Sequence, residues 1–308
     1  MDLARKDSFP SHGSYLFFLR NLRSGTGYGC NAETTILQPE EIKIIQNGYA
    51  PLFAKGNGTL VDGTVARRLA GHNPACVQVS LEGPCKVHDR IRGAGSHRLA
   101  RKGIQELVSA GVKVILSFTA HRENYDSFGS VAELGCGLGV APVWADRQVP
   151  LGIGRGFDML TPVQTRRFFE IMGRAREWGM SKGYPTDISM HRSLQFLVPG
   201  TLTYACNAGR NLLTILPDGC LVPCRRMPVI LGNVLHTPIS RIYYTSPFLS
   251  RLRNPDLVPG SCGGCTHLAA CRGGARCLAF AAYQDPFKAD PGCWLAKPKV
   301  SPGITAIC

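Results

Sequence analysis

The sequence predicts an α/β protein in which a parallel sheet with flanking helices precedes a smaller, cysteine-rich segment. Over the first two thirds of the 308 residues, short apolar β-branched runs alternate with amphipathic segments, as repeated strand–helix units do. From about Pro199 the chain changes to short apolar runs, many Gly and Pro, and dense cysteine, so a metal or cluster would be needed to hold it together. We therefore expect one domain over 1–198, a second over 199–296, and a flexible tail over 297–308.

The alternating segments can be assigned one by one. Buried apolar runs predict strands at 76–81, 112–118, 142–145 and 187–190. Helical spacing and end signals predict helices over 98–111, 130–139 and 161–178, the last with Thr161 as N-cap and Pro162 at its first position. Such units form either a doubly wound sheet or a barrel, and in both the chemistry gathers at the carboxyl ends of the strands.

Charge and hydropathy narrow the class of protein. The formal net charge is +14, but the basic residues are scattered pairs such as Arg67-Arg68 and Arg225-Arg226, without interleaved aromatic residues. This favours a solvated surface over nucleic-acid binding, with an acidic partner as the alternative. No run is long enough to span a membrane, and no cleavage site follows the apolar 15–19 run, so we expect a cytoplasmic protein.

Cysteine is the informative residue type. Of 13 cysteines, nine lie in the last 103 residues, which in a cytosolic protein favours metal binding over disulfides. In the first block, a predicted hairpin over 212–224 with a Pro217-Asp218-Gly219 turn brings Cys206 and Cys224 to one side of a metal. The second block is Cys262-x2-Cys265-x5-Cys271-x5-Cys277, followed by Cys293. Thiolates alone do not decide between zinc and an iron–sulfur cluster.

This spacing resembles the SPASM domain of radical-SAM enzymes, whose pattern is C-x(9–15)-G-x4-C, then C-x2-C-x5-C-x3-C, then a last cysteine. Segments of the sheet region are also similar to the barrel of that family: 57–60 to the end of its third strand, 77–93 to its fourth, and 119–124 to the end of its fifth. The resemblance covers about residues 14–295. It implies a partial (β/α)6-type radical-SAM barrel, reduced at its N-terminal side, followed by a small cysteine-rich SPASM iron–sulfur domain.

The resemblance also implies a set of ligands. One auxiliary [4Fe–4S] cluster would be bound by Cys262, Cys265, Cys271 and Cys293, and a second by Cys206, Cys224 and Cys277. Ala275 stands where the family has a cysteine, so Cys277 is taken as its substitute. The fourth ligand of the second set is left open, or is Cys220, because Gly200 occupies the position that some families use. Ser80 and Glu82, at the end of a strand that contacts SAM in the family, are candidate cofactor-binding residues, with an ordinary strand end as the alternative.

The motif that binds the SAM-cleaving cluster is absent. No C-x3-C-x2-C occurs in the sequence. The apolar 15–19 run resembles the family's first barrel strand, and the matching ligand positions after it are Arg20, Ser24 and Gly27, of which two cannot bind iron. Only 29 residues separate Gly27 from Asn57, and none of them resembles the family's Gly-Gly-Glu-Pro segment. Either a strand–helix unit has been lost or the region is rebuilt. The sequence therefore argues against cleavage of SAM by this chain.

Three functions follow from these observations. The first is a degenerate radical-SAM/SPASM protein that keeps its auxiliary clusters and, in peptide or cofactor modification, binds a peptide substrate or a partner radical-SAM enzyme or relays electrons. The second is an active radical-SAM oxidoreductase, a peptide maturase, whose N-terminal cluster region is altered here. The third is a structural zinc module. We expect no membrane partner and no nucleic acid.

Overall fold

The computed structural model describes residues 17–18 and 53–296, which form two compact units. One unit contains residues 17–18 and 207–254, and the other contains 53–206 and 255–296. The cysteine-rich residues 255–296 thus pack with the sheet unit, whereas the expected division placed them with 199–254. The predicted tail over 297–308, and the positions Arg20, Ser24 and Gly27, lie outside the described residues.

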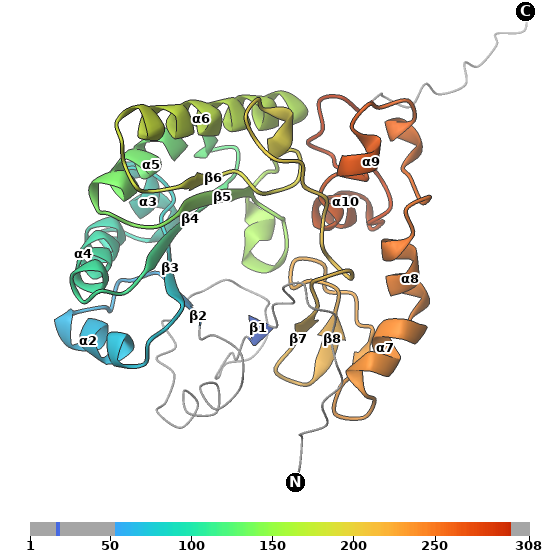
Figure 1. Ribbon diagram of the computed structural model, residues 1–308, viewed down its shortest axis with the longest axis horizontal. Coiled ribbons are helices and arrows are strands. Elements are labelled where there is room, and N and C mark those ends of the chain that lie inside the picture. Colours follow the sequence, from blue (N-terminus) through green and yellow to red (C-terminus); the bar gives the residue numbers. More distant parts are fainter. Residues whose placement is uncertain (1–16, 19–52, 297–308) are drawn as a thin grey trace, which may run out of the picture. The chain divides into compact units, whose positions relative to one another are not determined.

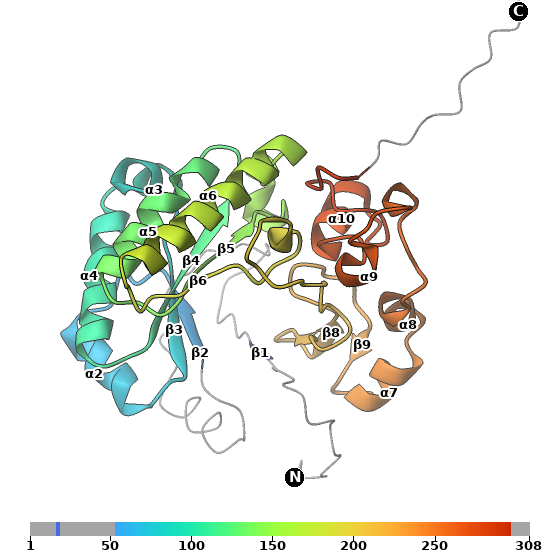
Figure 2. The ribbon, with the colours of Figure 1, turned by 45° about the horizontal axis from the view of Figure 1, so that its top comes forward.

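A five-stranded parallel sheet organises the larger unit. Its strands are β2 (Phe53–Gly56), β3 (Cys76–Ser80), β4 (Val114–Ala120), β5 (Val143–Arg147) and β6 (Ile188–Ser189), which pair in chain order. The intervening helices are α2 (Gly63–Gly71), α3 (Cys85–Arg92), α4 (Ser96–Ser109), α5 (Phe128–Gly137) and α6 (Pro162–Ser181). These helices lie along the outer side of the curved sheet (Figures 1 and 2). The predicted α/β class with a partial barrel is confirmed.

The helices cover the sheet because the sequence gives each one a buried stripe. In α4, Ala100, Ile104 and Leu107 recur at helical spacing and are fully buried. Helix α6 begins with the expected cap: Thr161 accepts from the backbone N–H of Gln164, whose side chain accepts from the N–H of Thr161. Phe118 of β4 packs among the other buried aromatic rings of this core, and each such side chain contributes about 1.5–3 kcal/mol.

Short helical turns and the cysteine-rich segment complete this unit. The turns are η1 (Tyr125–Ser127), η2 (Gly152–Gly156) and η3 (Gln195–Leu197). The segment contains η4 (Gly260–Cys262), α9 (Leu268–Cys271) and α10 (Arg276–Tyr283). It shares the core of the sheet: Cys271 is buried in the main cluster, and the Trp294 ring lies edge-on to Phe169 of α6, with centroids 6.2 Å apart.

The smaller unit is a four-stranded sheet with two helices. Its strands pair in the order β1 (Phe17–Phe18), β7 (Thr214–Ile215), β8 (Cys220–Val222) and β9 (Gly232–Asn233), and α7 (Ile239–Thr245) and α8 (Pro247–Arg253) follow. Strands β7 and β8 form the predicted hairpin, turning at Gly219, whose positive φ of 82° favours glycine. The expectation that 15–19 is the first barrel strand is wrong for its described residues, because Phe17–Phe18 pair with the open edge of β7.

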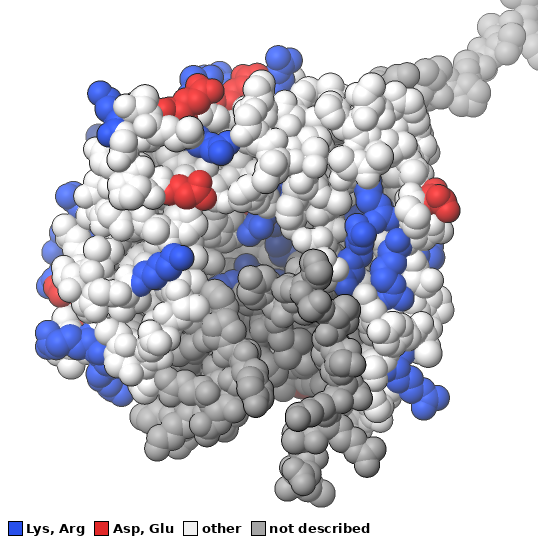
Figure 3. Space-filling view, viewed as in Figure 1, with Lys and Arg blue, Asp and Glu red and all other residues white. Residues whose placement is uncertain are grey.

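The surface carries basic side chains at several separate places rather than in one stripe, with acidic side chains fewer on the visible face (Figure 3). Within the described part of the chain, no helix combines the length and apolar character that crossing a membrane requires.

Candidate functional site

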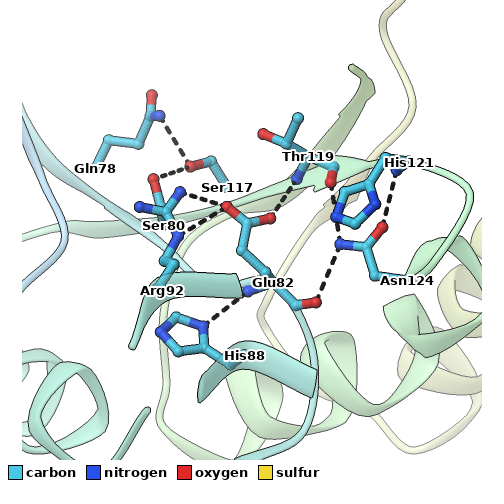
Figure 4. Close-up of polar contacts among 9 residues, drawn as sticks. All are labelled: Gln78, Ser80, Glu82, His88, Arg92, Ser117, Thr119, His121 and Asn124. Carbon is cyan, nitrogen blue, oxygen red and sulfur yellow. Dashed lines mark hydrogen bonds and ion pairs between the residues drawn. The ribbon is translucent and has the colours of Figure 1, made fainter. Parts of the chain in front are cut away.

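Glu82 lies just beyond the carboxyl end of β3, where the chain turns into α3, and its carboxylate is buried with 3% exposure. One carboxylate oxygen forms an ion pair with the guanidinium of Arg92 from α3. The other accepts a hydrogen bond of 3.0 Å from the backbone N–H of Thr119 in β4. Both oxygens are therefore occupied by groups of the chain itself (Figure 4).

Two further side chains fix the ends of β3 and β4 together. The Nδ1 atom of His88 accepts the backbone N–H of Glu82 at 3.0 Å, and burial lowers the pKa of His88 to about 4. The Asn124 amide donates to the carbonyl oxygens of Glu82 and Thr119, each at 3.1 Å, while its oxygen accepts the N–H of His121 at 2.8 Å. The two strand ends are thus one hydrogen-bonded unit (Figure 4).

Ser80 belongs to the same edge of the sheet. Its hydroxyl lies 3.3 Å from that of Ser117 on β4, which also accepts from the Gln78 amide at 2.9 Å. The structure therefore places both predicted cofactor-binding residues, Ser80 and Glu82, at the carboxyl end of β3. Ser80 contacts the Ser117 side chain, and Glu82 contacts the Arg92 side chain and the Thr119 backbone.

The cysteine-rich segment is built around the turn at Gly273-Gly274. Both residues have positive φ, 93° and 83°, and a Cβ on Gly273 would lie 2.7 Å from Cγ of Pro259. On the other side, the N–H of Asp290 donates to the Gly273 carbonyl at 2.9 Å, and Asp290 accepts the N–H of Ala275 at 2.8 Å. This turn brings together the chain segments 259–262, 271–277 and 290–293, which contain four of the predicted ligands.

A buried ion pair attaches this segment to the sheet. Arg147, the last residue of β5, donates from Nη1 and Nη2 to the two carboxylate oxygens of Asp290 at 2.7 and 2.6 Å. Both side chains are almost fully buried, with 4% and 0% exposure. Burial acts to lower the pKa of Arg147, but the Asp290 carboxylate more than offsets this and raises it. Asp290 also accepts the N–H of Gly292 at 2.9 Å, next to Cys293.

The chemistry of the thiols in this segment fits a cluster. Cys271 is buried and Cys262, Cys265 and Cys293 are half-buried. Burial raises the pKa of Cys271 to about 11, and burial followed by the neighbouring Cys293 and Cys265 raises the pKa of Cys262. Four soft sulfur donors therefore lie in one partly dry region, where an iron–sulfur cluster would take up the charge of their thiolates.

The thiols do not converge on one point. No group of three or more His, Cys, Asp or Glu side chains in residues 53–296 is arranged around a single metal ion.

The other predicted ligand set is divided between the two units. Cys206 and Cys277 belong to the sheet unit, whereas Cys224 and the alternative ligand Cys220 belong to the smaller one. The Cys224 sulfur accepts the N–H of Arg226 at 3.5 Å, and Cys220 is the first residue of β8. This set stays a prediction.

Sequence reasoning missed three charged residues of this region: Arg147, Asp290 and Arg276. Arg276, the first residue of α10, is buried with 4% exposure. For two of them the sequence offered only their nearness to predicted ligands: Asp290 precedes Cys293 by three residues, and Arg276 adjoins Cys277. Nothing local in the sequence links Arg147 to a residue 143 positions away.

Comparison with known proteins places these features in a family. Residues 206–266 match SPASM, an iron–sulfur cluster-binding domain. The AdoMet-dependent heme synthase of Methanosarcina barkeri is 24% identical over 259 residues, which cover 77% of this chain and 72% of that protein. The mycofactocin maturase MftC of Mycolicibacterium smegmatis is 30% identical over 250 residues, which cover 77% of this chain and 62% of that protein.

Solved structures agree on the fold. SuiB of Streptococcus suis bound to S-adenosylmethionine superposes with a TM-score of 0.65 at 13% identity, covering 84% of this chain and 62% of that one. SuiB has also been solved with its precursor peptide SuiA. The chain spans 62–72% of the length of these three proteins. The SPASM match, the relatives and the shared fold agree: the chain belongs to the radical-SAM/SPASM family, in a form without the C-x3-C-x2-C motif.

Proposed function

We propose that this chain is an iron–sulfur protein that carries auxiliary [4Fe–4S] clusters, does not cleave SAM, and acts in peptide or cofactor modification as a binding or electron-relay partner. The observation that carries the proposal is the contrast between two sets of ligands. The thiols grouped around the Gly273-Gly274 turn are kept, whereas Arg20, Ser24 and Gly27 replace the cysteines of the SAM-cleaving cluster.

The cysteine-rich segment supports the first part of this proposal. Cys262, Cys265, Cys271 and Cys293 would bind one cluster, and Cys206, Cys224 and Cys277 a second, with Cys220 or an open iron site completing it. When bound, such a cluster supplies one-electron transfer. The residues of the chain hold the ligands in place: Asp290 fixes the backbone on both sides of the thiols, and Arg147 anchors Asp290 to the sheet.

The strand ends support the second part. The Glu82 carboxylate holds Arg92 of α3 and the Thr119 N–H of β4 together. Together with the missing cysteines and the missing Gly-Gly-Glu-Pro segment, this favours a structural role for the former SAM-binding edge.

The charge of the smaller unit supports a peptide or protein partner. Residues 207–254 contain six arginines and one aspartate, and Arg210, Arg225, Arg241 and Arg251 are exposed. SuiB, which shares the fold, has been solved bound to the precursor peptide SuiA. An acidic segment of a peptide substrate or of a partner radical-SAM enzyme is the complement of such a surface.

The test is reductive cleavage of SAM. The anaerobically reconstituted protein is incubated with SAM and dithionite, and 5′-deoxyadenosine is measured by mass spectrometry, with an intact radical-SAM maturase as positive control. The proposal expects no product above that of a chain with Cys262, Cys265, Cys271 and Cys293 all replaced by alanine. Product that depends on this chain and on SAM would overturn it in favour of an active oxidoreductase with an altered N-terminal cluster region.

A further inference from the structure

Two exposed arginines of the smaller unit lie at one end of its β7–β8 hairpin. At the open end of this hairpin, the Gly209 N–H donates to the carbonyl oxygen of Pro223 at 3.2 Å. Arg210 and Arg225 lie within two residues of this contact, and both are exposed. Asp218, the one acidic residue among the described residues of this unit, lies in the turn at the opposite end of the hairpin. The open end therefore carries positive charge without an acidic residue from the described part of its own unit.

One tyrosine links a third arginine to this end. The Tyr243 hydroxyl of α7 donates to the backbone carbonyl oxygen of Arg210 at 2.9 Å. The guanidinium carbon of Arg253, the last residue of α8, lies 4.3 Å from the centre of the Tyr243 ring. The loop also packs closely against α8, because a Cβ on Gly209 would lie 2.7 Å from a leucine side chain of that helix. Arg210, Arg225 and Arg253 therefore form one group, which we call the arginine cluster.

The arginine cluster is less well balanced by acids than exposed arginines of the larger unit. In that unit, for example, Arg122 pairs with Asp158 at 2.7 Å. Neither Arg210 nor Arg225 has a carboxylate within ion-pair distance among the described residues. Cations held close together repel one another, so a cluster of this kind gains from an acidic partner that comes from outside the unit.

The type of cation narrows the chemistry of that partner. The described part of the smaller unit contains arginine but no lysine. A guanidinium is a planar fork that binds a carboxylate through two parallel N–H groups, whereas the ammonium of lysine acts as a point charge. Stacking on the Tyr243 ring holds the fork of Arg253 in one orientation, so less entropy is lost when a carboxylate binds. The cluster thus has the chemistry of a carboxylate-binding site.

We propose that the arginine cluster binds an acidic stretch of a peptide substrate. This rests on the proposed function, because it names the chemistry by which the chain recognises its peptide. In an extended peptide, alternate side chains point the same way and lie about 7 Å apart, so acidic residues at alternate positions can reach neighbouring guanidinium groups. Basic side chains lie in separate places on the surface rather than in a continuous track (Figure 3). This suits a short acidic stretch better than the long phosphate backbone of a nucleic acid.

The experiment measures binding of a defined acidic probe. A rhodamine-labelled peptide of alternating glutamate and serine is titrated with the reconstituted full chain and followed by fluorescence anisotropy. A matched peptide has glutamine in place of glutamate, and a single-stranded DNA oligonucleotide of similar length tests the phosphate alternative. The variants are Arg210→Gln, Arg253→Gln and the double variant. The control Arg167→Gln removes an exposed arginine from α6 in the larger unit.

The wild-type chain is expected to bind the glutamate peptide at least tenfold more tightly than the glutamine peptide. Each single variant should weaken binding about threefold and the double variant about tenfold, as expected for partly solvated ion pairs. Arg167→Gln should bind like wild type. Equal affinity for the two peptides, tighter binding of the oligonucleotide, or a double variant that binds like wild type would overturn the proposal.

A second measurement on the wild-type chain does not depend on how the variants fold. A glutamate peptide with a photoreactive benzoylphenylalanine at its centre is cross-linked to the protein, and the linked residues are located by mass spectrometry. Cross-links should fall within 207–254, and cross-links confined to 53–206 would overturn the proposal. SAM cleavage by a chain that binds the peptide at the cluster would contradict the proposed function alone. Absence of binding by a chain that does not cleave SAM would contradict this inference alone.

Discussion

The strand-end site and the cysteine-rich segment both contain buried charged groups, but they satisfy them differently. At the strand ends, Glu82, His88 and Asn124 have their partners within the chain: a guanidinium, a backbone N–H, and two carbonyl oxygens. In the cysteine segment, Arg147 and Asp290 pair with each other, whereas the buried Arg276 donates to the carbonyl oxygen of Pro286 and has no carboxylate within ion-pair distance among the described residues.

This difference indicates where a prosthetic group belongs. At the strand ends, the contacts of Glu82, His88 and Asn124 hold the sheet together, whereas Nε2 of His121 is buried without a hydrogen-bond partner among the described residues. Buried soft sulfur donors such as those of the cysteine segment suit an iron–sulfur cluster. The difference supports the proposal that residues 259–293 carry the retained chemistry and that the end of β3 has a structural role.

The largest expected difference between the two regions follows from removing a thiol of the cysteine segment. Replacing Cys271 with alanine should abolish one cluster, measured as a loss of iron and acid-labile sulfide, and destabilise the segment around it. The matched control is Cys76→Ala, which removes another buried thiol, in β3, and should leave the iron content unchanged. Equal iron loss in both variants would contradict the assignment.

Removing the Asp290 carboxylate, which anchors the segment, should destabilise the protein nearly as much as removing the Cys271 thiol. Asp290→Asn leaves the buried Arg147 guanidinium without its counter-ion, so we expect a loss of about 3–5 kcal/mol in the free energy of unfolding. Urea unfolding of the metal-free protein measures it. Asp285 is a half-buried aspartate of the same segment whose carboxylate accepts the N–H of Phe287, and Asp285→Asn should change stability by less than about 1 kcal/mol. Equal effects of the two changes would exclude the anchoring role.

At the strand ends, the free energy of unfolding should depend on pH through the buried His88. Between pH 6.5 and about 4 the unfolded chain binds a proton at His88 that the folded chain does not, so the free energy of unfolding falls as pH falls through this window. The loss attributable to His88 is up to about 3 kcal/mol. Arg92 and His97 face the ring and lower its pKa further, while Asp89 opposes them.

His88→Gln should flatten this dependence, which urea unfolding at pH 7 and pH 4.5 would reveal. Because His97 and His121 also have lowered pKa values through burial, the quantity to compare is the difference between wild type and variant at each pH. An identical slope in both proteins would mean that the buried imidazole of His88 is not the group responsible.

The smallest expected effect concerns Glu82. Glu82→Gln replaces the ion pair with Arg92 by a neutral contact, and since Arg92 is partly solvated we expect a loss of about 1–3 kcal/mol. Iron content should not change. A variant with unaltered stability would indicate a carboxylate that is free for a ligand, and would reopen a cofactor-binding role for Glu82 and Ser80.

Local sequence patterns predicted most of the elements. The run at 112–118 and the helical spacing over 98–111 correspond to β4 and α4, because a buried strand and a half-buried helix each impose their own period on the chain. The Pro217-Asp218-Gly219 turn likewise predicted the β7–β8 hairpin.

Pairings between distant residues could not be predicted in this way. The Phe17–Phe18 run reads as a strand, but the sequence does not say which sheet edge it joins, and it pairs with β7. The contact of Arg147 with Asp290 is a tertiary event without a local signature. For the candidate site, spacing identified the thiols, whereas the charges that surround them became visible only in the folded chain.

The most direct test of the central claim is the content of iron and acid-labile sulfide per chain after strictly anaerobic purification and reconstitution. Two auxiliary [4Fe–4S] clusters and no SAM-cleaving cluster predict about eight of each. A content of about twelve would reveal a third cluster and contradict the loss of the SAM-cleaving site. A content near zero, with zinc in its place, would contradict the iron–sulfur assignment and leave a structural metal module.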